Sequence, residues 1–187
     1  MRSSTIVVAN QKGGVGKTTT AANLAASFAA GDRRVLLIEV DPQGGLAESL
    51  SGHQEGEVFG LSDVLRGWTS FDDAITPTSV EGLTLLSSGK ANSKDELDLS
   101  RWTDDNPYAL REIIESVRDR FDVILLDTPP ALGAMTRSSL ASADGYLVPL
   151  QPEELAYRTL SQLLETVEEI KQSSNPELQC EGFLLTM

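Results

Sequence analysis

The sequence predicts an α/β protein with a mostly parallel, twisted sheet that carries helices on both faces. Short runs of β-branched and aliphatic residues alternate along the chain with longer stretches of helical periodicity, which is typical of strand–helix–strand units. Two of the strand runs, RVLLIEV at 34–40 and DVILL at 122–126, are almost wholly apolar. Such runs are expected where both faces of a strand are covered.

The elements are justified by periodicity and by residues suited to helix ends. A strand is expected at 5–9, followed by a helix at 18–30 that ends before Gly31. Asn106 and Pro107 suit the N-cap and first position of a later helix. The other expected elements are strands at 34–40, 83–87, 122–126, 145–150 and 182–187, and helices at 61–66, 136–143 and 153–171.

The stretch 44–105 is less periodic, yet no linker divides the chain. We therefore expect a single domain over 1–187. Trp68 and Trp102 fall in this stretch and are expected to be packing anchors.

Composition excludes several classes of protein. With 28 acidic against 15 basic residues, the net charge of −13 disfavours binding to DNA and to anionic lipid. Cys180 is the only cysteine and His53 the only histidine, so cysteine or histidine clusters cannot hold a metal. Cys180 is expected to be a buried strand residue and His53 to be exposed. The apolar runs are too short to span a bilayer, so we expect a cytoplasmic protein with no membrane contact.

A glycine-rich loop, QKGGVGKTTT at 11–20, lies between the first predicted strand and the first predicted helix. Glycines let backbone N–H groups turn inward around a phosphate, and the following helix N-terminus adds partial positive charge. In such a loop Lys17 reaches the β- and γ-phosphates and the Thr18 hydroxyl can bind Mg²⁺. The residues expected to bind ATP are Gly13, Gly14, Val15, Gly16, Lys17, Thr18 and Thr19.

The loop departs from the ordinary phosphate-loop pattern at its start. Gln11 stands where that pattern requires glycine, and Lys12 adds a second cation. A lysine at this place could neutralise charge that develops on a transferring phosphoryl group.

Two acidic residues follow predicted strands at the same edge of the sheet. Asp41 follows the strand at 34–40, and Asp127 follows the strand at 122–126. The carboxyl ends of parallel strands face the ligand crevice of such a sheet. Together with Thr18, these aspartates are expected to supply oxygen ligands for Mg²⁺.

These motifs resemble those of the ParA/MinD family of P-loop ATPases over nearly the whole chain. KGGVGKTTT resembles the deviant Walker A motif of the family, and IEVDPQGG resembles its switch I. DVILLDTPPALG resembles the Walker B strand and switch II, and LVPLQPEELAYRTL and GFLLTM match later segments. The motifs DPQG and DTPP favour the ParA and Soj partitioning branch over MinD.

The resemblance implies an ATP-bound sandwich dimer in which Lys12 reaches the partner's phosphates. It implies that Asp41 is the switch I residue that positions water, and that Asp127 is the Walker B acid. It also implies slow, Mg²⁺-dependent ATP hydrolysis that a ParB-like adaptor stimulates and that positions plasmid, chromosome or other cargo. A nucleoid-associated location follows from the same resemblance.

The resemblance also identifies departures from the family. Relatives commonly have Asp where this chain has Glu39, and often Asn where it has Gly45. Both lie beside the expected hydrolysis machinery and bear on the rate of turnover. Family members usually continue beyond GFLLTM into a segment with base-binding and DNA-binding residues, so weak DNA binding is expected of this chain.

Two other functions stay open at this point. One is a metabolic phosphotransferase or amide ligase built on the same loop. The other is an interaction module that binds nucleotide without hydrolysing it. An iron–sulfur reductase of related fold is excluded, because the chain lacks the cysteines that such a cluster needs.

Overall fold

The computed structural model describes residues 3–50, 59–89, 93–152 and 156–186. Its strands are β1 (Ser4–Val8), β2 (Val35–Glu39), β3 (Ile75–Pro77), β4 (Leu83–Leu86), β5 (Val123–Asp127), β6 (Gly145–Leu150) and β7 (Gln179–Leu185). Over the described residues they form one seven-stranded sheet in the order β3-β4-β2-β5-β1-β6-β7. Only the β3–β4 pair is antiparallel within this sheet. The predicted fold class is confirmed.

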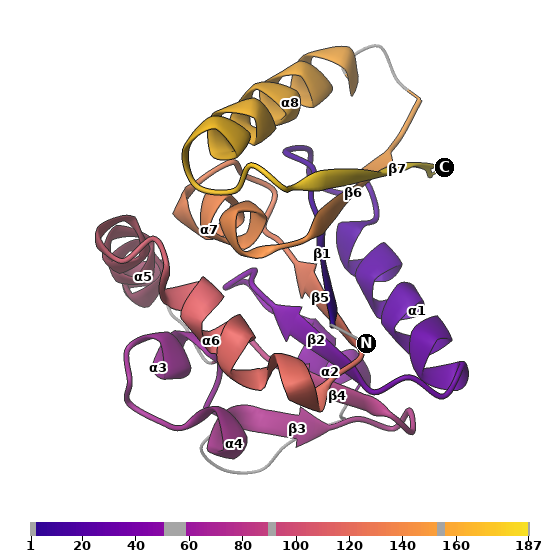
Figure 1. The fold of residues 1–187 in the computed structure, drawn as a ribbon, viewed down its shortest axis with the longest axis vertical. Helices are drawn as coiled ribbons and strands as arrows, with labels where there is room; N and C mark the ends of the chain where they lie inside the picture. The colour runs from indigo at the N-terminus through magenta and orange to yellow at the C-terminus, as the bar shows by residue number, and fades with distance from the viewer. Residues whose placement is uncertain (1–2, 51–58, 90–92, 153–155, 187) are drawn as a thin grey trace.

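Helices cover both faces of the sheet (Figure 1). The helix α1 lies on one side, and α6 and α7 lie on the other. The helices are α1 (Lys17–Ala30), α2 (Leu46–Leu50), α3 (Leu61–Leu65), α4 (Phe71–Ala74), α5 (Ser93–Asp105), α6 (Ala109–Val117), the 3-10 turn η1 (Arg118–Arg120), α7 (Ala134–Ser142) and α8 (Ala156–Ser173).

The alternation of side chains along each strand divides the core into two layers. On β2, Val35 and Leu37 pack in the layer that contains Ala21 of α1. Leu36 and Ile38 pack in the opposite layer, which contains residues of α6, α7 and α8. All of β2 is buried, which explains why its sequence is apolar without alternation.

Helix starts and the middle region were the weakest sequence predictions. The helix expected from Asn106 begins at Ala109, with Tyr108 in the N-cap position. Asn106 instead closes α5, because its backbone and side-chain N–H groups both donate to the Trp102 carbonyl. The sequence also gave no sign of α5, whose stretch SKDELDLSRWTDD has few apolar residues.

Two expectations about single residues are corrected, and one is confirmed. Cys180 is exposed, because β7 is an edge strand with little cover. Trp68 is 67% exposed and lies beneath the Arg66 guanidinium, so it is not a core anchor. Trp102 does pack against the core. His53 and the expected helical residues 153–155 lie outside the described residues.

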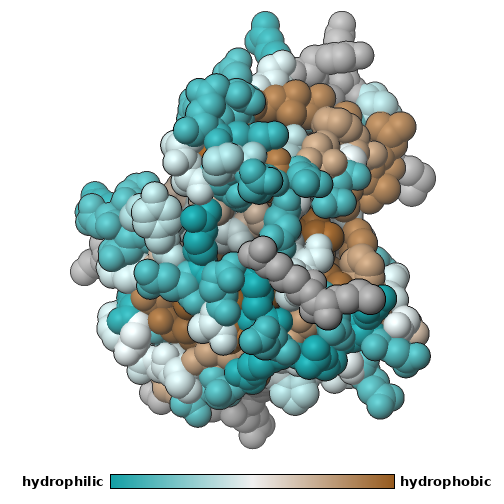
Figure 2. All heavy atoms as spheres, viewed as in Figure 1, coloured by the Kyte–Doolittle hydropathy of each residue, from teal (hydrophilic) through white to brown (hydrophobic). Residues whose placement is uncertain are grey.

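The strand β7 leaves apolar surface uncovered at one edge of the sheet. Phe183, Leu184 and Leu185 are 50%, 41% and 69% exposed. Figure 2 shows hydrophobic atoms gathered at this end, whereas much of the remaining visible face is hydrophilic. No helix in the described part of the chain is both long and apolar enough to cross a membrane.

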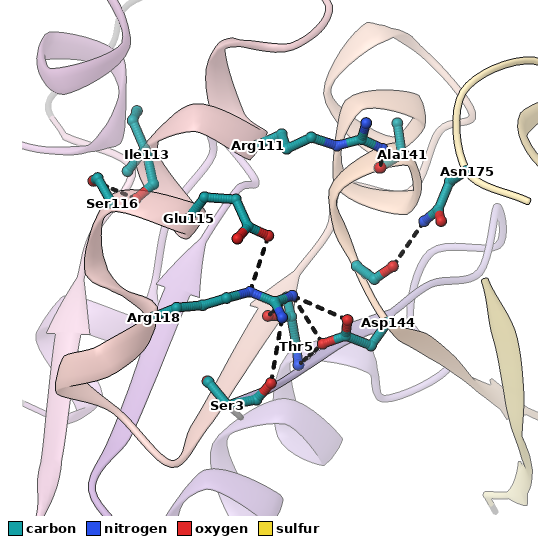
Figure 3. Close-up of polar contacts among 11 residues, drawn as sticks. Ser3, Thr5, Arg111, Ile113, Glu115, Ser116, Arg118, Ala141, Asp144 and Asn175 are labelled. Atoms are coloured by element: carbon teal, nitrogen blue, oxygen red, sulfur yellow. Dashed lines mark hydrogen bonds and ion pairs between the residues drawn. The ribbon is translucent and has the colours of Figure 1, made fainter. Parts of the chain in front are cut away.

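At the edge of the sheet where the parallel strands begin, the buried side chain of Arg118 forms an ion pair with Asp144, whose side chain is 41% exposed (Figure 3). Arg118 in η1 is 6% exposed, and its Nη2 donates to both carboxylate oxygens of Asp144 at 3.0 and 2.9 Å. The same carboxylate accepts the Thr5 N–H at 2.8 Å, and Arg118 Nε lies 3.1 Å from a Glu115 oxygen. This network fastens η1 to the starts of β1 and β6, at the opposite edge from the phosphate loop.

We predict that Asp144→Ala destabilises the chain by about 2 kcal/mol, because the buried Arg118 side chain and the Thr5 N–H both lose the carboxylate to which they donate. The matched control is Glu169→Ala, which removes the partner of the 41% exposed Arg137 side chain. That loss should stay below about 1 kcal/mol. Urea unfolding measures both, and equal midpoints for the two variants would contradict the prediction.

Candidate functional site

The predicted phosphate loop and both aspartates meet at the carboxyl edge of the sheet. The parallel register pairs Val8 of β1 with Asp127 of β5, and Asp127 with Glu39 of β2. The three central strands therefore end level with one another, and the loops that leave them are neighbours. A pocket of about 290 Å³ opens there, lined by Gly13, Gly14, Gly16, Lys17, Thr18, Thr19, Asp41 and Pro130.

The phosphate loop has a backbone that glycine makes possible. Gly14 and Gly16 adopt φ angles of +74° and +89°, which residues with a Cβ rarely do. Gly16 occupies the N-cap position of α1, so the positive end of a helix of 14 residues opens into the pocket. Val15 does not line the pocket through its side chain, which is 2% exposed and packed beneath the loop.

Lys17 is held inside the loop. Its side chain is buried, and Nζ donates to the Lys12 carbonyl at 3.3 Å. Burial lowers the pKa of Lys17, while the nearby carboxylates of Asp127 and Asp41 act in the opposite direction. An anion in the pocket would meet this ammonium group within a partly desolvated surrounding, where charge–charge attraction is strong.

Asp127 lies beneath the pocket and is 1% exposed. Burial raises its pKa to about 6, opposed by a side-chain hydrogen bond with Thr18 and by the charge of Lys17. Its Oδ1 is buried without a hydrogen-bond partner among the described residues. An unpaired buried carboxylate oxygen beside a threonine hydroxyl fits a hard divalent cation such as Mg²⁺, which prefers oxygen ligands.

Asp41 is held in a tight turn at the rim of the pocket. Its Oδ1 accepts the Gln43 N–H at 3.0 Å, and its carbonyl accepts the Gly44 N–H at 3.0 Å. The backbone before it is fixed too, because the Val40 N–H donates to the Asp127 carbonyl at 2.8 Å. The structure thus brings Asp41 to the same pocket as Lys17 and Thr18, as the sequence predicted.

Lys12 takes a different direction from Lys17. Its Nζ donates to Gln151 Oε1 at 3.2 Å, directly after β6. The Gln151 amide in turn donates to the Gly14 carbonyl at 3.4 Å. Lys12 is absent from the residues that line the pocket, so within one chain it lies beside the phosphate loop.

Sequence reasoning missed the residues that support this loop from β6 and β7. Besides Gln151, the Asn10 amide donates to the Pro149 carbonyl at 2.7 Å. The Thr186 hydroxyl donates to the Val15 carbonyl at 2.9 Å. The partners are 139 and 171 residues apart, and only the order of strands in the sheet brings them together.

Comparison with known sequences finds similarity to chromosome partitioning proteins. A family described as an AAA domain matches residues 3–180. The chromosome partitioning protein ParA of Myxococcus xanthus is 40% identical over 182 residues, which cover 97% of this chain and 64% of that protein. The chromosome-partitioning ATPase Soj of Thermus thermophilus is 40% identical over 182 residues, 97% of this chain and 68% of that protein. The chain thus spans roughly two thirds of these relatives' length.

A solved structure of a similar protein has the same fold. The cobyrinic acid a,c-diamide synthase of Mycobacterium smegmatis, with a bound ATP analogue and magnesium, superposes with a TM-score of 0.88. The two sequences are 36% identical, and the match covers 98% of this chain and 74% of that one.

We predict that Asp127→Asn stabilises the chain at pH 8 by on the order of 2 kcal/mol, because its ionised form is disfavoured in the folded state. The folded pKa of about 6 exceeds the ordinary value of 3.8, so the folded chain binds the proton more tightly than the unfolded chain does. As the pH rises through about 6, the parental chain loses the part of its folding stability that this bound proton contributes.

The stability difference between variant and parent should therefore be smaller at pH 5 than at pH 8. Urea unfolding at both pH values measures it. Asp119→Asn, at an exposed carboxylate, is the matched control and should change stability little at either pH. A destabilised Asp127→Asn chain at pH 8 would refute the assignment of a buried, charge-disfavouring site.

Proposed function

Because the chain belongs to the ParA/MinD family of P-loop ATPases, close to its ParA and Soj members, we propose that it is a Mg²⁺-dependent partition ATPase. Two ATP-bound copies form a sandwich dimer that positions plasmid, chromosome or other cargo in the cytoplasm. Hydrolysis is slow in the chain alone and is stimulated by a ParB-like adaptor. The net charge of −13 argues against strong DNA binding by this chain itself.

The observation that carries this proposal is the contrast between the two loop lysines. Lys17 is buried and donates within its own phosphate loop, whereas Lys12 lies against Gln151 outside the pocket. A cation beside the loop is well placed to act on a nucleotide other than its own. We assign Lys12 to the partner's transferring phosphoryl group, and Lys17 with the loop amides to its own nucleotide.

The remaining roles follow from the pocket. Asp41, in its tight turn at the rim, orients the attacking water. Thr18, Asp127 and Asp41 hold Mg²⁺, and the unpaired Oδ1 of Asp127 supports this assignment. When bound, Mg²⁺ neutralises negative charge on the β- and γ-phosphate oxygens. The backbone amides of the loop bind the same oxygens without moving, which favours the charge distribution of the transition state.

A second candidate function is amide ligation, because a cobyrinic acid a,c-diamide synthase is 36% identical to the chain. A ligase would consume ATP only with its carboxylic acid substrate and an amine donor. A partition ATPase would instead respond to a DNA-bound adaptor protein. Phosphate release measured with each addition separates the two, and binding of ATP without turnover under either condition would indicate an interaction module.

We predict that Lys12→Ala still binds ATP but hydrolyses it at least about a hundredfold more slowly, because a cation supplied in trans stabilises the transferring group. It should also fail to dimerise when ATP is added. Lys17→Ala is the comparison variant and should lose ATP binding itself, because it removes the buried charge that meets the phosphates.

Calorimetry measures ATP binding, light scattering measures dimerisation, and a phosphate-release assay measures turnover. Full turnover by Lys12→Ala, or hydrolysis by a parental chain that stays monomeric, would rule out action across the dimer. Unchanged ATP affinity in Lys17→Ala would rule out the phosphate site.

A further inference from the structure

We propose that Glu39 is a positioning residue that holds the Asp41 turn in place, with Gly45 as the glycine that makes this contact possible. This inference rests on the proposed ATPase function and concerns how the hydrolytic aspartate is fixed. Glu39 and Gly45 are the two departures that the resemblance to the ParA/MinD family identifies. The Glu39 carboxylate accepts the N–H of Leu46, the residue directly after Gly45.

The Glu39 carboxylate is enclosed and is bonded on both oxygens. Glu39 is 2% exposed. Its Oε1 accepts the Leu46 N–H at 2.7 Å, and its Oε2 accepts the N–H and the hydroxyl of Ser88, both at 3.2 Å. A buried carboxylate must have such donors, because an unpaired one is strongly disfavoured. Moving the Glu39 carboxylate away would therefore leave buried hydrogen-bonding groups without partners.

One of these bonds closes a loop around Asp41. The chain leaves β2 at Glu39, makes the Asp41–Gly44 turn and begins α2 at Leu46. Because Glu39 binds the N–H of Leu46, the two ends of this loop are tied to the same side chain. Asp41 thus projects from a closed loop of fixed length.

Gly45 directly precedes the donor and has a φ of +130°. A residue with a Cβ is strained at that angle, so asparagine or alanine there would tend to turn the following N–H elsewhere. Gly44 also lies close to the Glu39 carboxylate, since a Cβ at Gly44 would lie 3.8 Å from Glu39 Oε2. The two glycines and the long Glu39 side chain therefore fit together at this contact.

The other carboxylate oxygen of Glu39, Oε2, is bonded to Ser88 in the loop after β4. Ser88 follows β4, which pairs in register with β2. Beyond it, a Cβ on Gly60 would collide with the backbone of Gly89, so the two loops are in direct backbone contact. The Leu61 N–H also donates to the Ser87 carbonyl at 2.7 Å. Glu39 therefore fastens the Asp41 loop to a part of the chain that α3 also supports.

The test uses Glu39→Leu, which removes both acceptor oxygens and nearly keeps the volume of the side chain, so the N–H groups of Leu46 and Ser88 both lose their acceptor. The second variant is Gly45→Ala, which attacks the same bond from its other end. Ser142→Ala is the matched control, because it removes a buried hydroxyl near the start of β6.

For Glu39→Leu and for Gly45→Ala we expect hydrogen exchange at the Leu46 amide to be at least about tenfold faster, because this N–H loses its acceptor. The turnover number should fall about tenfold, while ATP affinity stays within about twofold, because Asp41 loses its position and the phosphate loop does not. The effects of the double variant should be smaller than the sum of the two single effects, since both substitutions remove the Leu46 bond. Ser142→Ala should show none of these changes.

Unchanged exchange at Leu46 in Glu39→Leu would overturn the inference. So would faster exchange with parental turnover, or a parallel fall in ATP affinity and turnover. A parental chain without turnover, with or without the adaptor, would overturn the proposed function instead. Hydrogen exchange at the Leu46 amide would then still decide whether Glu39 holds the Asp41 loop.

Discussion

The strands β1, β2 and β5 end level with one another at one edge of the sheet, and the rest of the site depends on this constraint. Parallel pairing in register brings Val8, Glu39 and Asp127 to one edge, so three separate loops must turn in the same small space. The buried charges of that edge have their partners in these loops and in the loop after β4: Glu39 accepts from Leu46 and Ser88, and Lys17 donates to the Lys12 carbonyl. At the opposite edge, where the strands begin, the buried Arg118 pairs with the partly exposed Asp144.

The two carboxylates at this edge are treated differently by the fold. Glu39 has hydrogen bonds on both oxygens, whereas Asp127 keeps one oxygen without a partner in the described chain. Because the two residues are neighbours on adjacent strands, the contrast cannot come from depth alone. It reflects a division between an acid that fixes the backbone and an acid that is left available for a ligand.

The sequence was sufficient for the parts of the site that depend on local order. The loop at 11–20, Asp41 and Asp127 each follow a strand, so the parallel sheet alone predicts that they meet. The support from Gln151 and Thr186 could not be predicted, because it depends on which strands lie beside β1. Cys180 was misjudged for a similar reason, since an edge strand and a central one can have the same apolar sequence. Trp68 lies in the bend after α3, where its ring contacts the Arg66 guanidinium instead of the core. Helix α5 was missed because its stretch has few apolar residues, although Leu99 and Trp102 pack on the core.

The exposure of Cys180 has a practical consequence. It is the only cysteine in the chain, and it lies on the strand whose following residue, Thr186, contacts the phosphate loop. A thiol-reactive fluorophore would therefore attach at one known place without any engineered residue. Cys180 pairs with Tyr146 near the start of β6, so the label would lie at the end of β7 away from the phosphate loop, and two labelled copies would show the approach of one subunit to another by energy transfer.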